Sequence, residues 1–82
     1  MTYFDQFRSS NDSVIQQAAN MLEDATARYQ AGTLAKNEFT ELSNDILDFQ
    51  HIAANISDMV RQQAIYEAFQ QLSTIVSTIL SL

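Results

Sequence analysis

One stretch of the sequence gathers most of the side chains that could do chemistry. Four carboxylates, Glu38, Glu41, Asp45 and Asp48, recur at spacings of three and four, and His51 follows Asp48 by three positions. Residues at these spacings share one face of an α-helix. The Asp48-x-x-His51 pair is similar to the Glu-x-x-His pairs with which helical bundles bind two iron or manganese ions. A metal site is therefore the first chemistry to weigh.

The apolar residues beside these carboxylates argue against that site. Each carboxylate precedes an apolar residue of the same stretch; these are Phe39, Leu42, Ile46 and Phe49. Bundle metal sites need carboxylates that point inward from several helices, whereas these lie on the flank of the apolar seam or outside it. We expect a solvated acidic face that leaves room for an Arg or Lys from a neighbour, with His51 as a surface or interface residue.

The rest of the chain offers no catalytic set. Cysteine is absent, His51 is the single histidine and Gly32 the single glycine. A thiolate site, a serine–histidine triad and a glycine-rich phosphate loop are therefore excluded. We predict that the protein is not an enzyme and that it binds no metal or cofactor.

The charge of the chain narrows the class of partner. The formal net charge is −6, and the only cations are Arg8, Arg28, Lys36 and Arg61. Phosphate backbones and anionic membranes attract clustered Lys and Arg, so we expect no direct nucleic-acid binding. An acidic surface suits solubility or a basic protein partner.

Composition favours a single helical domain, residues 1–82. The chain has 82 residues and no proline, and Ala, Gln, Leu and Glu favour helix. We predict an N-terminal arm (1–11), a first helix (12–31), a turn (32–34) and a second helix (35–81). A chain of this size buries only about 60% of its unfolded surface, so we expect oligomerisation to add burial.

Two apolar seams predict an antiparallel helical hairpin. The first helix begins with a capping-box pattern from Ser13 to Gln16 and ends at Gly32, which tolerates the left-handed conformation that closes helices. Its seam is Ile15, Ala18, Leu22, Ala25 and Tyr29. The second seam is Phe39, Leu42, Ile46, Phe49, Ala53, Ile56 and Val60. Antiparallel pairing places Tyr29 near Phe39, and Leu34 plugs the closed end.

The stretch MLEDATARYQAGTLAKNEFTELSNDIL, residues 21–47, resembles the short helical hairpin of the SHOCT family. That family has a glycine–hydrophobic turn, then Thr-x-x-Glu-Phe opening a helix and a leucine closing it. The matching residues are Gly32, Leu34, Glu38, Phe39 and Leu47, and Ala35 stands where the family has a capping Thr or Ser. The resemblance covers about a third of the chain and implies an oligomerisation module.

Beyond Val60 the apolar face rotates. The tail set is Ile65, Phe69, Leu72, Val76, Ile79 and Leu80, widened by Ala68, Ile75 and Leu82. No Gly or Pro follows Gly32, and a helix can continue through such a slip. We therefore expect one second helix of about 45 residues and about 70 Å, oligomeric through its C-terminal half. The alternative is a three-helix bundle broken near residues 55–58, where Asn55 or Ser57-Asp58 could cap a new helix.

Two groups of side chains are expected at an interface. The first helix is too short to cover the tail of so long a second helix, so the tail set should be buried by another chain. In the arm, Tyr3, Phe4 and Phe7 have two readings that we weigh equally. They pack on their own helices, or they anchor a neighbouring subunit, since aromatics are enriched in interface cores.

Three functional hypotheses follow. The first is a structural subunit of a large assembly, specifically a bacteriophage virion component, that binds copies of itself and other subunits. The second is an acidic inhibitor or nucleic-acid mimic that blocks a basic surface. The third is a membrane-active helical protein, disfavoured because the uncharged tail is shorter than the roughly 20 residues that span a bilayer. The N-terminus shows no signal-peptide pattern, which places the protein in a virion or the host cytoplasm.

Overall fold

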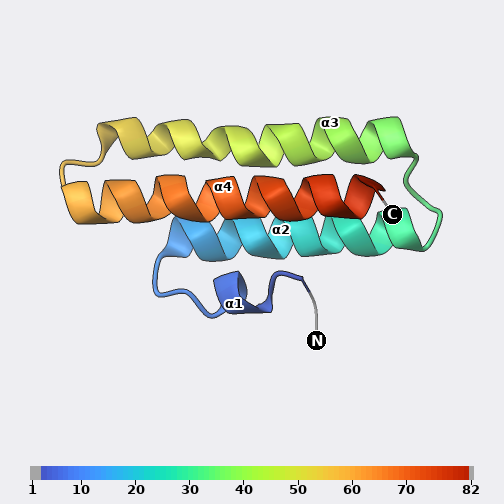
Figure 1. Ribbon diagram of the computed structural model, residues 1–82, viewed down its shortest axis with the longest axis horizontal. Coiled ribbons are helices and arrows are strands. Elements are labelled where there is room, and N and C mark those ends of the chain that lie inside the picture. Colours follow the sequence, from blue (N-terminus) through green and yellow to red (C-terminus); the bar gives the residue numbers. More distant parts are fainter. Residues whose placement is uncertain (1–2, 82) are drawn as a thin grey trace.

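The computed structural model describes residues 3–81, and every regular element in this range is a helix (Figure 1). The elements in chain order are α1 (Asp5–Arg8), α2 (Ser13–Gln30), α3 (Lys36–Leu47), the 3₁₀-helix η1 (Asp48–Asn55) and α4 (Met59–Ser81). The predicted all-α class is confirmed.

The prediction of one long second helix is wrong, and the chain forms the alternative three-helix bundle. After η1 the chain turns through residues 56–58, here called the junction. α4 then runs back beside α3 and α2 (Figure 1). The molecule measures 41 × 24 × 18 Å. It is therefore far shorter than the helix of about 70 Å expected from the continuous apolar pattern.

Local hydrogen bonds stabilise the junction as a non-helical break between η1 and α4. The Asp58 carboxylate accepts the backbone N–H groups of Val60 and Arg61, at 3.0 and 3.2 Å. It thereby satisfies donors that the first turn of a helix leaves free. The Gln62 side-chain amide donates to the Ala53 carbonyl oxygen at 2.8 Å. Side chains thus pair with backbone groups on both sides of the break, although the sequence has neither glycine nor proline there.

The opposite end of the hairpin closes around Gly32, as predicted. Gly32 has a φ of +83°. The Thr33 N–H donates to the Arg28 carbonyl at 3.0 Å and the Gly32 N–H to the Tyr29 carbonyl at 3.1 Å, the bonds of a Schellman motif. The rings of Tyr29 and Phe39 stack with centroids 4.7 Å apart, so their predicted pairing is confirmed.

The N-terminal cap of α2 lies one residue before the predicted position. Asp12, not Ser13, is the cap, and its carboxylate accepts the Val14 N–H at 2.9 Å. The Gln16 side chain does not reach back to the cap; it donates to the Arg8 carbonyl at 3.0 Å. The shift follows from Asp12 having an extended backbone, which aims its side chain at the helix end.

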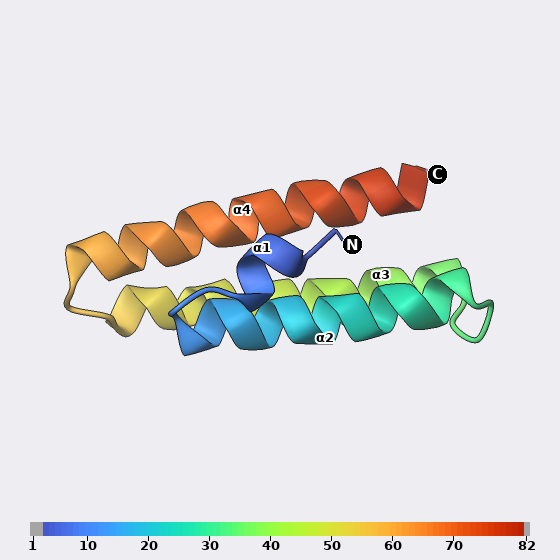
Figure 2. The same ribbon diagram turned by 90° about the horizontal axis from the view of Figure 1, so that it is seen from below.

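The arm packs on its own helices, and part of it is helical. Figure 2 shows α1 lying across the space between α2 and α4. Phe4 and Phe7 are buried there, whereas Tyr3 is exposed. For Phe4 and Phe7 the first of the two readings therefore holds.

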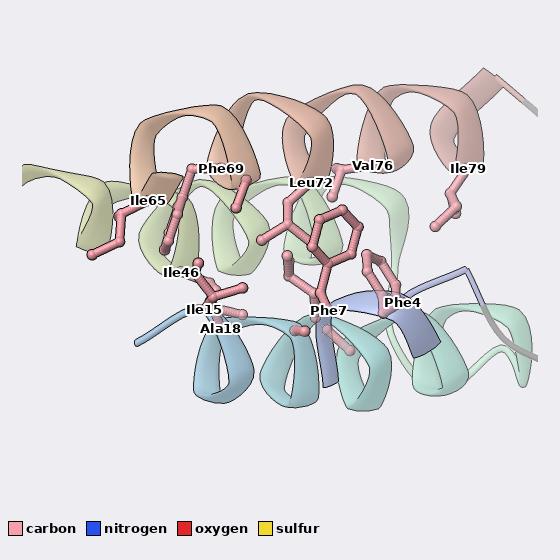
Figure 3. Close-up of a cluster of buried hydrophobic side chains, with 14 of the residues drawn as sticks. Phe4, Phe7, Ile15, Ala18, Ile46, Ile65, Phe69, Leu72, Val76 and Ile79 are labelled. Carbon is pink, nitrogen blue, oxygen red and sulfur yellow. The ribbon is translucent and has the colours of Figure 1, made fainter. Parts of the chain in front are cut away.

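The tail completes the core of its own chain. Figure 3 shows tail side chains of α4 facing those of the arm, α2 and α3. The buried tail residues are Ile65, Phe69, Leu72, Val76 and Ile79. Because burial of each such side chain contributes about 1.5–3 kcal/mol, folding α4 back is strongly favoured over leaving this face in water.

Two hydroxyl groups are enclosed by this core. Ser43 on α3 and Thr26 on α2 are buried, and neither side-chain oxygen has a hydrogen-bond partner among the described residues. An unpaired buried hydroxyl costs free energy.

Candidate functional site

The acidic face of α3 and η1 lies in solvent. Glu38, Glu41, Asp45 and Asp48 are all exposed, and Glu38 accepts the Ala35 backbone N–H at 3.0 Å. His51 Nδ1 contacts the carbonyl oxygen of Asp48 on its own helix. In residues 3–81 no group of three potential ligands is placed to hold a metal ion. The arrangement is a solvated face, as expected from the sequence.

The predicted tail interface needs correction. Ile65, Phe69, Leu72, Val76 and Ile79 are buried by their own chain, with Leu80 partly buried against them, while Leu82 lies outside the described residues. The prediction assumed that α2 could not reach the tail. It can, because the break at the junction brings α4 alongside α2. These side chains are thus core residues of the bundle.

Large apolar side chains are exposed instead on η1 and in the first turn of α4. Val60 is 81% exposed and Met59 is 77% exposed, in the first turn of α4. Phe49 and Ile52 on η1 are 37% and 41% exposed, and residues three apart eclipse one another on a 3₁₀-helix. We call these four residues the junction surface.

The exposure of the junction surface follows from the break. Phe49 and Val60 belong to the seam that the sequence places inside a long helix, yet the chain turns before Val60 can continue it. Met59 and Ile52 were missed as surface candidates, because neither belongs to the seam. The signal that could have identified them is Asp58, since a strong capping residue just before Met59 predicts that a helix starts there.

The charges near this end of the bundle are mainly negative. Asp48 lies beside Phe49, and Asp58 beside Met59. Arg61 also lies here, but its guanidinium Nε donates to Asp12 Oδ2 at 2.6 Å. That bond, together with the bond from the Val14 N–H, holds the pKa of the Asp12 carboxyl below its usual value of 3.8.

The two other arginines are also paired. Arg8 forms ion pairs with Asp5 and Glu23, at 3.6 and 2.8 Å, and Arg28 with Asp24 at 3.2 Å. Among residues 3–81 no Lys or Arg forms an ion pair with Glu41, Asp45 or Asp48. The acidic face is therefore free to meet a cation from outside the chain.

Two depressions in the described surface are both open to solvent. One depression is lined by Asn11, Asp12, Ser13 and Arg61, around the ion pair just described. Another lies over Lys36, Asn37, Thr40 and Glu41 on the outer side of α3. Neither depression contains the single histidine, His51. We therefore take the apolar junction surface as the stronger candidate for function.

No helix in the described part of the chain combines the length and the apolar character needed to cross a bilayer. No protein-family model, no curated protein and no solved structure matches this chain.

Proposed function

We propose that this protein is a non-enzymatic subunit that self-associates through helix packing within a larger assembly, with the junction surface as its contact region. The observation that carries the proposal is the exposure of Val60 and Met59, at 81% and 77%. The same chain buries five large apolar side chains of the tail set, those of Ile65, Phe69, Leu72, Val76 and Ile79. Exposed apolar side chains that form a contiguous patch are typical of interaction sites.

The setting that we propose for this assembly is a bacteriophage virion. It draws on the sequence: a chain of 82 residues, without cysteine, whose helices are rich in Gln, Asn and Ser. Mass spectrometry of purified particles from the source of the chain would test this setting. Stoichiometric recovery of the chain with particle proteins supports it, and its absence from the particles contradicts it.

The contact region is tested by polar substitution at the two most exposed positions. The Met59→Ser, Val60→Ser double variant should keep the helix content of the parent, because neither side chain contributes to the core. Sedimentation velocity over a concentration series should show the parent associating and the variant remaining monomeric.

Met21→Ser is the matched control, since Met21 is an exposed apolar residue on α2, at 37%. It should associate like the parent. Equal association of the parent and the double variant would show that the junction surface is not the contact. A parent that stays monomeric throughout would contradict self-association itself.

A second function is favoured by the unpaired carboxylates of α3 and η1. An exposed row of Glu41, Asp45 and Asp48 could bind a basic protein surface, which is the acidic-inhibitor hypothesis. An Asp45→Asn, Asp48→Asn variant should then bind a lysine-rich probe protein several-fold more weakly at low salt, whereas Glu67→Gln on α4 should bind like the parent. Binding that is insensitive to salt and to these substitutions would exclude this function.

A further inference from the structure

The apolar seam from Phe39 to Val60 runs across the junction, but only some of its residues are buried in the bundle. Phe39, Ile46 and Ala53 are buried. The seam members between and beyond them are not: Leu42 and Phe49 are each 37% exposed, and Val60 is 81% exposed. The three-four spacing of this seam is that of a coiled coil, and it is continuous only if residues 56–58 are helical.

Nothing in the backbone of the junction prevents it from becoming helical. The only positive φ recorded in the described residues is that of Gly32, so the junction residues adopt ordinary conformations of L-amino acids. Eight residues of 3₁₀-helix precede the break, and 3₁₀ stretches within longer helices often mark hinges because their hydrogen bonds are poorer. At the break itself, the side-chain hydrogen bonds are those of the Asp58 cap and that of Gln62 with the Ala53 carbonyl.

We propose that two copies of this chain exchange α4. In the exchanged dimer the junction straightens, α3, η1 and α4 form one helix of about 70 Å, and α4 of each copy packs on α2 and α3 of the other. The contacts of the tail are then re-formed between copies, which is why domain exchange is a low-cost route to dimers. This inference rests on the proposed self-association and names its partner and its geometry.

The straightened junctions supply a contact that the monomer lacks. Two such segments cross side by side at the centre of the dimer, so Phe49, Ile56 and Val60 of each copy can pack against their counterparts. Seam residues that are exposed or partly buried in the monomer thereby become buried between the two copies. A short connection between packed helices is the setting in which exchange is expected. Because each copy carries a formal charge of −6, added salt should raise the dimer fraction.

Two substitutions at the junction should shift the equilibrium between the monomer and the exchanged dimer in opposite directions. Ser57→Pro should lock the monomer. Ile56 already has the extended conformation, φ −88° and ψ 123°, that a residue before proline adopts, and the Ser57 N–H has no recorded hydrogen bond in the described chain. Proline inside a continuous helix is strongly disfavoured. Asp58→Ala should favour exchange, because it removes the cap and inserts the best helix former.

The measurement is size-exclusion chromatography with light scattering, combined with small-angle X-ray scattering over a concentration series. Asp58→Ala is expected to raise the dimer fraction several-fold over the parent, with a maximum dimension well beyond the 41 Å of the monomer. Asp58→Asn keeps a capping side chain and should behave like the parent. Ser57→Pro should remain monomeric with unchanged helix content by circular dichroism.

The outcomes separate exchange from simple surface contact. A Ser57→Pro variant that dimerises like the parent overturns exchange and leaves the junction surface as an ordinary contact. A folded Asp58→Ala variant that stays monomeric at every concentration also overturns it. If Asp58→Ala loses helix content, the dimer fractions of the parent and of Ser57→Pro are compared instead, and they decide whether α4 is exchanged. Self-association that disappears in Met59→Ser, Val60→Ser but persists in Ser57→Pro supports the proposed function alone.

Discussion

Arg61 Nε lies 2.6 Å from Asp12 Oδ2, so an ion pair joins the first turn of α4 to the N-terminal cap of α2 across 49 residues of chain. Asp12 is the more buried partner, with its side chain 13% exposed against 45% for Arg61. The same carboxylate thus caps one helix and fixes the start of another.

This double role predicts an acid-dependent stability. Because the pKa of Asp12 is lower in the fold than its usual 3.8, its contribution is fully present above that value. The contribution is lost as the pH falls through the folded pKa. Urea unfolding from pH 6 to pH 2.5 should show the parent losing stability faster than Asp12→Asn below about pH 4. The asparagine keeps an oxygen for the Val14 N–H but cannot titrate. Parallel profiles for the two proteins would contradict the assignment.

Ser43→Ala should stabilise the bundle by about 1 kcal/mol. The substitution removes a fully buried hydroxyl that has no recorded partner in the described residues, and alanine leaves almost no void. Thermal and chemical unfolding measure the change. Thr40→Ala on the same helix is the control, since the Thr40 hydroxyl is paired with the Lys36 carbonyl at 2.8 Å. A destabilised Ser43→Ala would indicate that the hydroxyl binds a buried water.

Leu72 and Val76 test the burial of the tail within its own chain. Leu72→Ala should cost about 2–5 kcal/mol in the free energy of unfolding, because Leu72 is fully buried. Leu72→Asp with Val76→Asp should destroy most of the helix content of the monomer. Circular dichroism of dilute protein measures both, with the exposed Val60→Ala as a near-neutral control. A folded monomeric double variant would show that α4 is not part of the core.

Gly32→Ala should destabilise the hairpin by about 1–2 kcal/mol. The cause is conformational, since a β-carbon at Gly32 would meet no atom within 4 Å, but the φ of +83° is unfavourable for alanine. Gly32→Asn should cost less, because asparagine tolerates this region better. Equal losses for the two variants would point to a cause other than backbone conformation.

The sequence predicts the first hairpin well because local patterns determine it. The seam from Ile15 to Tyr29, the turn at Gly32 and the contact of Tyr29 with Phe39 each follow from spacing or from glycine chemistry. The acidic face of α3 follows as well, since it lies beside an apolar seam. These features require no knowledge of what the rest of the chain does.

The helix break at the junction could not be predicted from local sequence patterns in the same way. The periodicity from Phe39 to Val60 continues through it, and no Gly or Pro marks it. What decides the break is the gain from burying the tail against α2 and the arm, a long-range effect that a local pattern does not contain. From the sequence alone, Asp58 was a possible N-terminal cap of a new helix. Only the fold-back of α4 makes that cap preferable to a continuous helix, and the junction surface is its by-product.

The order of the helices also has a kinetic consequence. α2 packs on α3, and η1 on α4, so successive elements are neighbours in space and much of the core can form without closing long loops. Helical domains of such topology fold in microseconds to milliseconds. The pairing of α2 with α4 and the insertion of Phe4 and Phe7 close longer loops. The rate at which the tail finds α2 should therefore limit the rate of folding. Stopped-flow refolding into low denaturant should slow when Leu72 is truncated.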